Sequence, residues 1–427
     1  MSCRPRERPY GVRSSAFRRL SWAWAVSMCG DGVRSVALPL YVAVHHHDPL
    51  DMAAVAASET LPWLLGALPV GTLVDRLPPR TVLVVAHALR ALATTGLVVV
   101  LSAGVDTLAV LCAFAFVLTT LELFADPASQ VMTVRLVPPG ELERANSRYY
   151  SIGMLATGLV GPLAGSAIFV VGPVWAFALD GSTFVAAALL AATIPLPGER
   201  VPARAARRGS LKSEMAEGAR LLLTHPELRV LAVLVAVAGL AVSAVNTLLP
   251  LYAVEQLGPH GVGLLVAVFG IATLLGAALP TRLPARLAGA RAMIAGLAAA
   301  GAGFTAFGLS QRPAVLWGGC CLAGIGLGLW NVLCSSRRQR LTPPAALGRV
   351  SGVYRMMTWG LNPVGSVLAG VAASATAIRV PLLLAGAAVL AVLAVLAPAL
   401  RRGETGSPVV SPCPPDAKHL ADVPPAW

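Results

Sequence analysis

Long apolar runs alternate with short polar stretches along the whole 427-residue chain. Most of these runs are about 20 residues long, which is enough for one helix to cross the hydrocarbon core of a bilayer. The pattern predicts about twelve membrane helices, at residues 18–43, 54–75, 81–101, 107–127, 147–171, 174–194, 229–254, 262–282, 290–309, 313–335, 350–373 and 378–399. The predicted fold class is therefore an all-α integral membrane protein.

The stretch after the sixth predicted helix divides the chain into two sets of six helices. It carries three prolines and a run of arginines, and its residues 213–223 are equally compatible with a short amphipathic helix on the membrane surface and with a plain loop. The predicted organisation is a basic cytoplasmic tail, a six-helix bundle, a cytoplasmic linker, a second six-helix bundle and a disordered cytoplasmic tail, at residues 1–17, 18–194, 195–228, 229–400 and 401–427.

Residues 135–144 and 340–349 are two copies of one segment, with six of ten positions identical at an offset of 205. A second loop repeats at the same offset, so the chain reads as a duplication. Both six-helix halves then present the same face to the cytoplasm, which is a parallel repeat. The copies differ, because the first half keeps Asp75 and Arg76 where the second has proline and threonine.

Composition supports the membrane assignment. The chain is 56% hydrophobic and 12% charged, with a mean hydropathy of +0.73, whereas soluble domains carry about 25% charged residues. The net charge is +13, and the basic residues gather in alternate loops. By the positive-inside rule, this predicts a multi-pass protein of the cell membrane with both termini in the cytoplasm. Nucleic-acid binding is excluded, because the alternation leaves no contiguous basic face.

Neither metal nor cofactor chemistry is predicted. The seven cysteines show no metal-ligand spacing. His45, His46 and His47 follow one another in the first outer loop, but successive histidines in a flexible loop rarely converge on one ion. The acids are scattered and do not cluster with nucleophiles at one membrane face, so a membrane-embedded enzyme is not expected.

The segment from Gly71 to Arg80 resembles the signature loop of the major facilitator superfamily, written G-x-L-x-D-R-x-G-R-[KR]. Gly71, Asp75, Arg76 and Arg80 match it, with a leucine at the third position, while two prolines replace the glycine and the basic residue that usually follow. The resemblance implies a major facilitator fold of two parallel six-helix repeats. It also implies a conformational latch, for which Asp126, at the cytoplasmic end of the fourth helix, is a plausible partner of Arg76 or Arg80. A fixed structural ion pair is the alternative.

Further segments resemble the branch of drug and siderophore exporters called transmembrane secretion effectors, which includes macrolide and enterobactin exporters. The first predicted helix carries Ser-Met-Cys-Gly-Asp-Gly at residues 27–32, and Gly-Pro-Leu-Ala-Gly stands at 161–165. This resemblance implies a secondary active transporter that exports a small hydrophobic or amphipathic compound by proton antiport. Uptake, an uncoupled facilitator and a non-transporting receptor are the alternatives, and we expect a monomer.

Ionisable groups at membrane depth are costly and point to function. Asp31 and Arg34 lie three residues apart in the first helix, so they form either a self-neutralising pair or a proton site at Asp31. Glu122 in the fourth helix is the second proton-carrier candidate, or it neutralises Arg90 of the third. Two further acids have no predicted role. Glu59 is compatible with hydration at the rim of the membrane, and Asp180 is left unexplained.

The second half holds no acid at mid-depth, only polar groups and the lone cation Arg355. A cation with no acid in its own half must reach across to the first half, meet a ligand or extend to the membrane surface. The remaining predicted substrate-cavity residues are Arg34, Arg90, Trp24, Trp330, Trp359 and Asn362. The predicted partners are therefore a small-molecule substrate, protons and the lipid bilayer.

Overall fold

The computed structural model describes residues 11–74, 77–195, 211–282, 289–310, 312–342 and 347–406. Within these ranges the chain is helical and contains no β-strand. The first half consists of α1 Ser15–His45, α2 Pro49–Val74, α3 Pro79–Ser102, α4 Leu108–Leu136, η1 Pro139–Glu141, α5 Leu142–Leu155, η2 Ala156–Val160, α6 Gly161–Val171 and α7 Pro173–Ala192. The rest consists of α8 Leu211–Thr224, α9 Pro226–Ala278, η3 Leu279–Thr281, α10 Ala290–Leu309, α11 Pro313–Leu341, α12 Leu347–Gly360, α13 Asn362–Ala375 and α14 Arg379–Gly406.

Helix α9 contains two membrane passes joined by a sharp turn. Its 53 residues are far more than one crossing needs. The helical geometry breaks at Gly258, whose φ of 69° lies in the left-handed region, and Pro259 follows. Glycine adopts this conformation without steric cost, and proline cannot continue the preceding helix. The turn therefore falls where the sequence predicts a boundary between two helices.

Two other predicted spans are interrupted. The fifth consists of α5 and α6, joined by η2, a single π-helical turn next to Pro162. The eleventh consists of α12 and α13, which break at Leu361 before Pro363. Among the described residues, eight helices are long and apolar enough to cross a membrane. Counting α9 twice and adding α1, α2 and the α12–α13 pair gives the twelve predicted passes.

The segment between the halves does form a helix, α8, which packs against α9 and α12 of the second half. The sequence left a helix and a loop equally open here. Residues 196–210 of the predicted linker lie outside the described residues, as do residues 1–10 of the first tail. At the other end, α14 continues to Gly406, beyond the predicted end of the last helix, and the remainder of the predicted tail is outside the described part.

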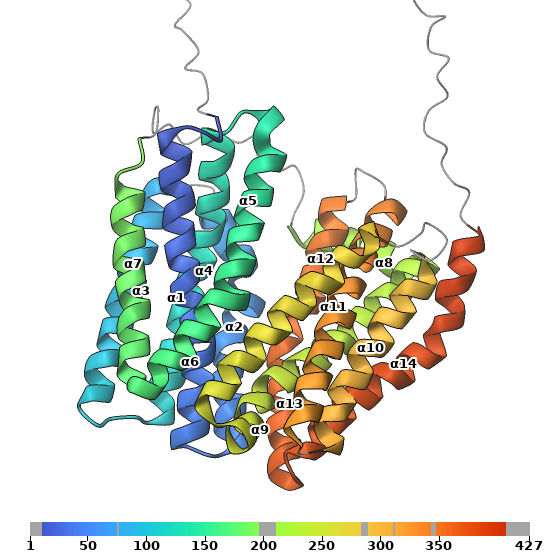
Figure 1. The fold of residues 1–427 in the computed structure, drawn as a ribbon. Helices are drawn as coiled ribbons and strands as arrows, with labels where there is room; N and C mark the ends of the chain where they lie inside the picture. The colour runs from blue at the N-terminus through green and yellow to red at the C-terminus, as the bar shows by residue number, and fades with distance from the viewer. Residues whose placement is uncertain are drawn as a thin grey trace, which may run out of the picture.

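The two halves stand side by side, and α1 begins at the same end of the molecule at which α14 ends (Figure 1). At that end the helices of the two halves diverge, whereas at the opposite end they meet. The contact there is made by α13 against the start of α2 and by α6 against the second pass of α9. A Cβ on Gly370 would collide with Ala53, and one on Gly263 would collide with Ser166. Small residues thus let the backbones of the two halves approach closely.

Candidate functional site

Two arginines and three carboxylates form one ionic cluster inside the first half. Arg34 of α1 donates to Glu59 Oε1 at 2.9 Å and to Asp31 Oδ1 at 3.2 Å. Arg90 of α3 also donates to Asp31 Oδ1. The carboxylate of Glu122 on α4 lies 3.8 Å from Arg90 and 3.9 Å from Arg34. Four helices therefore contribute to one site. The sequence indicated the pairs Asp31–Arg34 and Arg90–Glu122 within it, but not that they join and include Glu59.

The cluster is buried unevenly. Arg90 is 1% exposed and lies over the ring of Phe184, with 4.1 Å from its guanidinium carbon to the ring centroid. The side chains of Glu59 and Glu122 are 23% and 21% exposed. The closed side of the cluster therefore faces α7, and its accessible side is formed by these two glutamates.

Asp180 of α7 is a fourth acid beside the cluster. It is 0% exposed, and neither carboxyl oxygen has a hydrogen-bond partner among the described residues. A Cβ added to Gly30 would lie 2.6 Å from Asp180 Oδ1, so this carboxyl group packs against α1 one residue before Asp31. The structure therefore places Asp180 in the interior, and Glu59 in an ion pair rather than in simple hydration at the rim.

A cavity of about 560 Å³ separates the two halves beside this cluster. Arg34 and Glu59 line it from the first half. From the second half it is lined by hydroxyl and amide groups, which belong to Ser243, Asn246, Thr247, Asn362 and Ser366. The remaining lining is largely aliphatic, with one aromatic ring, Phe269. The described lining therefore has an ionic wall in the first half, which also carries the hydroxyl groups of Ser35, Thr60 and Thr157, and a neutral polar wall in the second half.

The neutral wall is held by its own hydrogen bonds. The hydroxyl of Ser243 donates to the backbone oxygen of Asn362 at 2.6 Å and lies 2.9 Å from the hydroxyl of Ser366. Thr247 also donates to the Ser366 hydroxyl, at 2.9 Å. Sequence reasoning selected Asn362 here but missed the hydroxyl groups. The four-residue spacing of Ser243 and Thr247, which puts them on one helix face, was the available signal.

The other predicted cavity residues are distributed differently. Arg90 is sealed inside the first half, and Trp330 packs in the core of the second half with 1% exposure, so neither lines the cavity between the halves. The position of Trp330 in the middle of an apolar helix did not reveal which face of the helix it occupies. Arg355 and Trp359 belong to α12, but their side chains lie outside the described part.

Trp24 and Asp126 line a second, smaller cavity of about 320 Å³ near the diverging end of the first half. The indole of Trp24 donates to the backbone oxygen of Tyr149 at 3.3 Å, and the two rings lie 5.2 Å apart. Trp24 is thus a cavity residue, though of a different cavity from that of Arg34.

The predicted latch falls largely on residues whose placement is not described. Asp75 and Arg76 lie outside the described residues, and Gly71 is placed only as part of α2. Arg80, on α3, donates to the backbone oxygen of Ala192 at the end of α7. The latch therefore stays a prediction.

Two histidines at the junction of α1 and α2 make ordinary hydrogen bonds. The ring of His46 contacts Asp51 Oδ2 at 2.8 Å and the backbone oxygen of Asp106 at 3.0 Å, while His45 contacts the backbone oxygen of Tyr41. Among the described residues, no group of three or more potential ligands is arranged to hold a metal ion.

A fold of twelve passes in two halves, with a cavity between them and buried charges beside it, defines a membrane transport protein. The family model of the Major Facilitator Superfamily matches residues 20–363 and 231–422. The chain is 30% identical over 397 residues to the multidrug efflux pump Tap of Mycolicibacterium fortuitum, covering 88% of this chain and 94% of that protein. The chain therefore belongs to the Major Facilitator Superfamily, and it is a transporter rather than an enzyme.

Solved structures show the same fold. The nucleoside transporter NupG superposes with a TM-score of 0.71 at 15% identity, covering 91% of this chain and 100% of that one. A bacterial homologue of the iron transporter ferroportin, in an inward-facing state, superposes with a TM-score of 0.69 at 19% identity and covers 89% and 97%. At these identities the likeness concerns the fold alone.

Proposed function

We propose that this transporter exports a small hydrophobic or amphipathic compound in exchange for protons. The observation that carries the proposal is the excess of acids over bases in the first half. Asp31, Glu59, Glu122 and Asp180 surround only two arginines. If all were ionised, the group would carry a net charge of 2 − 4 = −2.

An uncompensated charge at membrane depth costs several kcal/mol. Two bound protons would remove the excess, and Asp180 is the natural holder of one, since its buried oxygens contact no described donor. The acids that face the arginines are suited to exchange the other: Asp31, which contacts both, and the partly exposed Glu59 and Glu122. Each of these acids can therefore either bind a proton or pair with an arginine, and a site that couples proton binding to transport needs such a choice.

Proton uptake at Asp31 or Glu122 would loosen its pairing with Arg34 and Arg90. A loosened Arg34 becomes available to the cavity that it lines. Compound and proton then compete for the same guanidinium and carboxyl groups, so that the entry of one favours the release of the other. This competition is the simplest basis for antiport.

The cavity supports an amphipathic cargo. Its aliphatic lining suits apolar surface, while the hydroxyl and amide wall offers donors and acceptors with no formal charge. The relative from Mycolicibacterium fortuitum is described as a multidrug efflux pump, which favours export over uptake and over an uncoupled facilitator.

The arrangement of the halves supports a state open toward the end at which α1 begins. We assign that end to the cytoplasm, on the arginine pattern of the loops, and the whole protein to the cell membrane as a monomer. In the opposite state, the diverging ends would close, and Asp75, Arg76 and Arg80 would latch them, with Asp126 as the partner of an arginine.

The test uses purified protein in lipid vesicles with an imposed pH gradient and a panel of fluorescent amphipathic dyes. Wild type should move dye against its gradient when protons flow the other way. Asp31→Asn and Glu122→Gln should lose this gradient-driven movement by at least tenfold. Glu255→Gln, a change at an exposed acid of the second half, is the matched control and should transport normally.

Three results would contradict the proposal. Wild-type dye movement that ignores the pH gradient would indicate a facilitator. Movement into the compartment that corresponds to the cytoplasm would indicate uptake. Gradient-driven transport retained by both cluster variants would remove Asp31 and Glu122 as proton carriers.

A further inference from the structure

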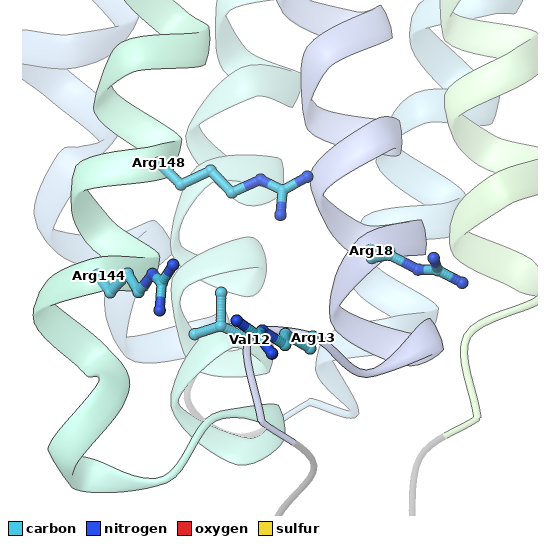
Figure 2. A pocket seen from close by; sticks show the side chains of 5 residues that line it. All are labelled: Val12, Arg13, Arg18, Arg144 and Arg148. Atoms are coloured by element: carbon cyan, nitrogen blue, oxygen red, sulfur yellow. The ribbon is translucent and has the colours of Figure 1, made fainter.

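A pocket of about 460 Å³ lies at the diverging end of the first half, apart from the transport cavity. It is lined by Val12 and by four arginines, Arg13, Arg18, Arg144 and Arg148. Arg144 and Arg148 are one turn apart on α5. Arg144 points toward Val12 and Arg13 at the start of α1, and Arg148 points toward α1 itself (Figure 2). Arg18 extends from the other side of α1 in this view.

The geometry of this pocket is fixed by contacts between segments far apart in sequence. The backbone nitrogen of Val12 donates to Glu141 Oε2 at 2.7 Å, which ties the start of α1 to the start of α5. Farther into the membrane, Arg148 lies 6.0 Å from the ring centroid of Phe17. The fold therefore brings Arg13, Arg144 and Arg148 near one another from two segments far apart in sequence, while Arg18 borders the pocket from the other side of α1.

The four positive charges lack a matching set of acids. Among the described side chains, no carboxylate lies within 4.0 Å of any of these four guanidinium groups. The nearby carboxylate of Glu141 binds the backbone of Val12. Guanidinium groups bind phosphate oxygens in a planar, two-pronged geometry, so a pocket of this charge suits a phosphate group.

The level of the pocket indicates the source of that phosphate. Trp22, one turn beyond Arg18 on α1, is 60% exposed, whereas Tyr150, just beyond Arg148 on α5, lines the cavity of about 320 Å³. Exposed tryptophan is enriched at the level of lipid headgroups.

We infer that this arginine pocket binds the phosphate group of an anionic phospholipid at the membrane surface. Basic pockets between membrane helices recognise such headgroups. The inference does not depend on the transported compound or on proton coupling. The bound lipid would join the start of α1 to α5, which belong to the first half and stand at its diverging end.

The experiment measures binding of phosphatidylglycerol to the purified full-length protein by native mass spectrometry. Wild type should retain phosphatidylglycerol in preference to phosphatidylcholine. The double variant Arg144→Gln with Arg148→Gln should weaken retention about 30-fold, because each arginine near the membrane surface strengthens lipid binding about fivefold. The matched control is Arg220→Gln with Arg229→Gln, two exposed arginines of α8 and α9, which should leave retention unchanged.

A second variant separates charge from geometry and guards against misfolding. Arg144→Lys with Arg148→Lys keeps the charge but not the two-pronged contact, so it should lose less than the glutamine pair. Thermal unfolding of every variant without added lipid should match wild type.

Three outcomes would overturn the inference. One is equal loss in the control pair, which would show only general attraction between lipid and a basic protein. Another is absence of headgroup preference in wild type. The last is full displacement of the lipid by millimolar inorganic phosphate, which would identify the pocket as a site for a soluble anion.

Discussion

The two halves of this transporter handle buried polarity in opposite ways. The first half concentrates formal charge, with Asp31, Arg34 and Arg90 in direct contact at its centre. The second half faces the same cavity with hydroxyl groups, of which Ser243 and Ser366 lie 2.9 Å apart. In the second half, the described ion pair between Arg337 and Glu227 lies near the start of α9 and the end of α11 rather than at the cavity.

This difference separates two tasks that a coupled transporter must perform. Charged groups can exchange protons, because their pairing changes with protonation. Hydroxyl groups cannot do so near neutral pH, but they orient a cargo by hydrogen bonding. The duplication seen in sequence therefore provides two similar scaffolds, and, in the proposed mechanism, the described part of the second half leaves proton chemistry to the buried acids of the first.

The largest expected effect comes from breaking the ionic cluster. Arg90→Met should lower the stability of the protein by about 3–5 kcal/mol, because it leaves Asp31 buried without its second cation. Arg337→Met removes a pair of the second half whose arginine is 21% exposed, against 1% for Arg90, and should cost less, about 1–2 kcal/mol. Thermal unfolding in detergent compares the two, and equal losses would contradict the proposed contrast between the halves.

The contact between the halves gives the next largest effect. Gly370→Ala should weaken the packing of α13 on α2 by about 1–3 kcal/mol, since the added carbon collides with Ala53. Hydrogen exchange of residues 49–60 should speed up accordingly. Gly318→Ala, where the added carbon meets nothing within 4 Å, is the matched control. Unchanged exchange in Gly370→Ala would argue against this contact as the closed gate.

A smaller effect is expected from the neutral wall. Ser366→Ala removes the hydroxyl shared by Ser243 and Thr247 and should cost about 1 kcal/mol of stability. Dye affinity should fall a few-fold, with no change in how that affinity depends on pH. Equilibrium binding by dye fluorescence between pH 6 and pH 9 measures both quantities. A changed pH dependence would assign proton chemistry to the second half and break the comparison.

The smallest effect on stability should come from Asp180→Asn. If Asp180 holds a proton in this state, the amide replaces a neutral group of the same shape and should change stability by less than about 0.5 kcal/mol. Because compound and protons compete, wild-type dye affinity should rise with pH, and Asp180→Asn should leave that rise unchanged, since Asp180 keeps its proton while other acids of the cluster exchange theirs. The same fluorescence titration measures the slope. A large loss of stability would show that Asp180 is ionised.

Much of the fold could be predicted from the pattern of apolar runs. The twelve passes follow from run length, and the turn at Gly258 follows from a glycine that precedes a proline. The interruptions at η2 and at Leu361 were not predicted, because an apolar run that stays helical on both sides of a break looks continuous in sequence. The stretch that became α8 was ambiguous, since its short amphipathic pattern depends on packing against the second half.

The site was predicted only in part. Spacing along one helix indicated the contact between Asp31 and Arg34, because residues three apart are neighbours. The contacts that Glu59 and Asp180 make with other helices depend on how those helices rotate, which one sequence does not determine. The same reason explains why Trp330, chosen for its depth, lies in the core while Ser243 and Thr247 line the cavity.

The closed end of the molecule has a consequence for ionic strength. Gly370 meets Ala53 there, and Gly263 meets Ser166, so the described close contacts carry no formal charge. Dissolved ions screen exposed charges but leave such contacts unaffected. The opposite end carries exposed arginines, on which salt does act. The two ends therefore respond unequally to the same solution. With the diverging end assigned to the cytoplasm as proposed, salt on that side should change how long that end stays open.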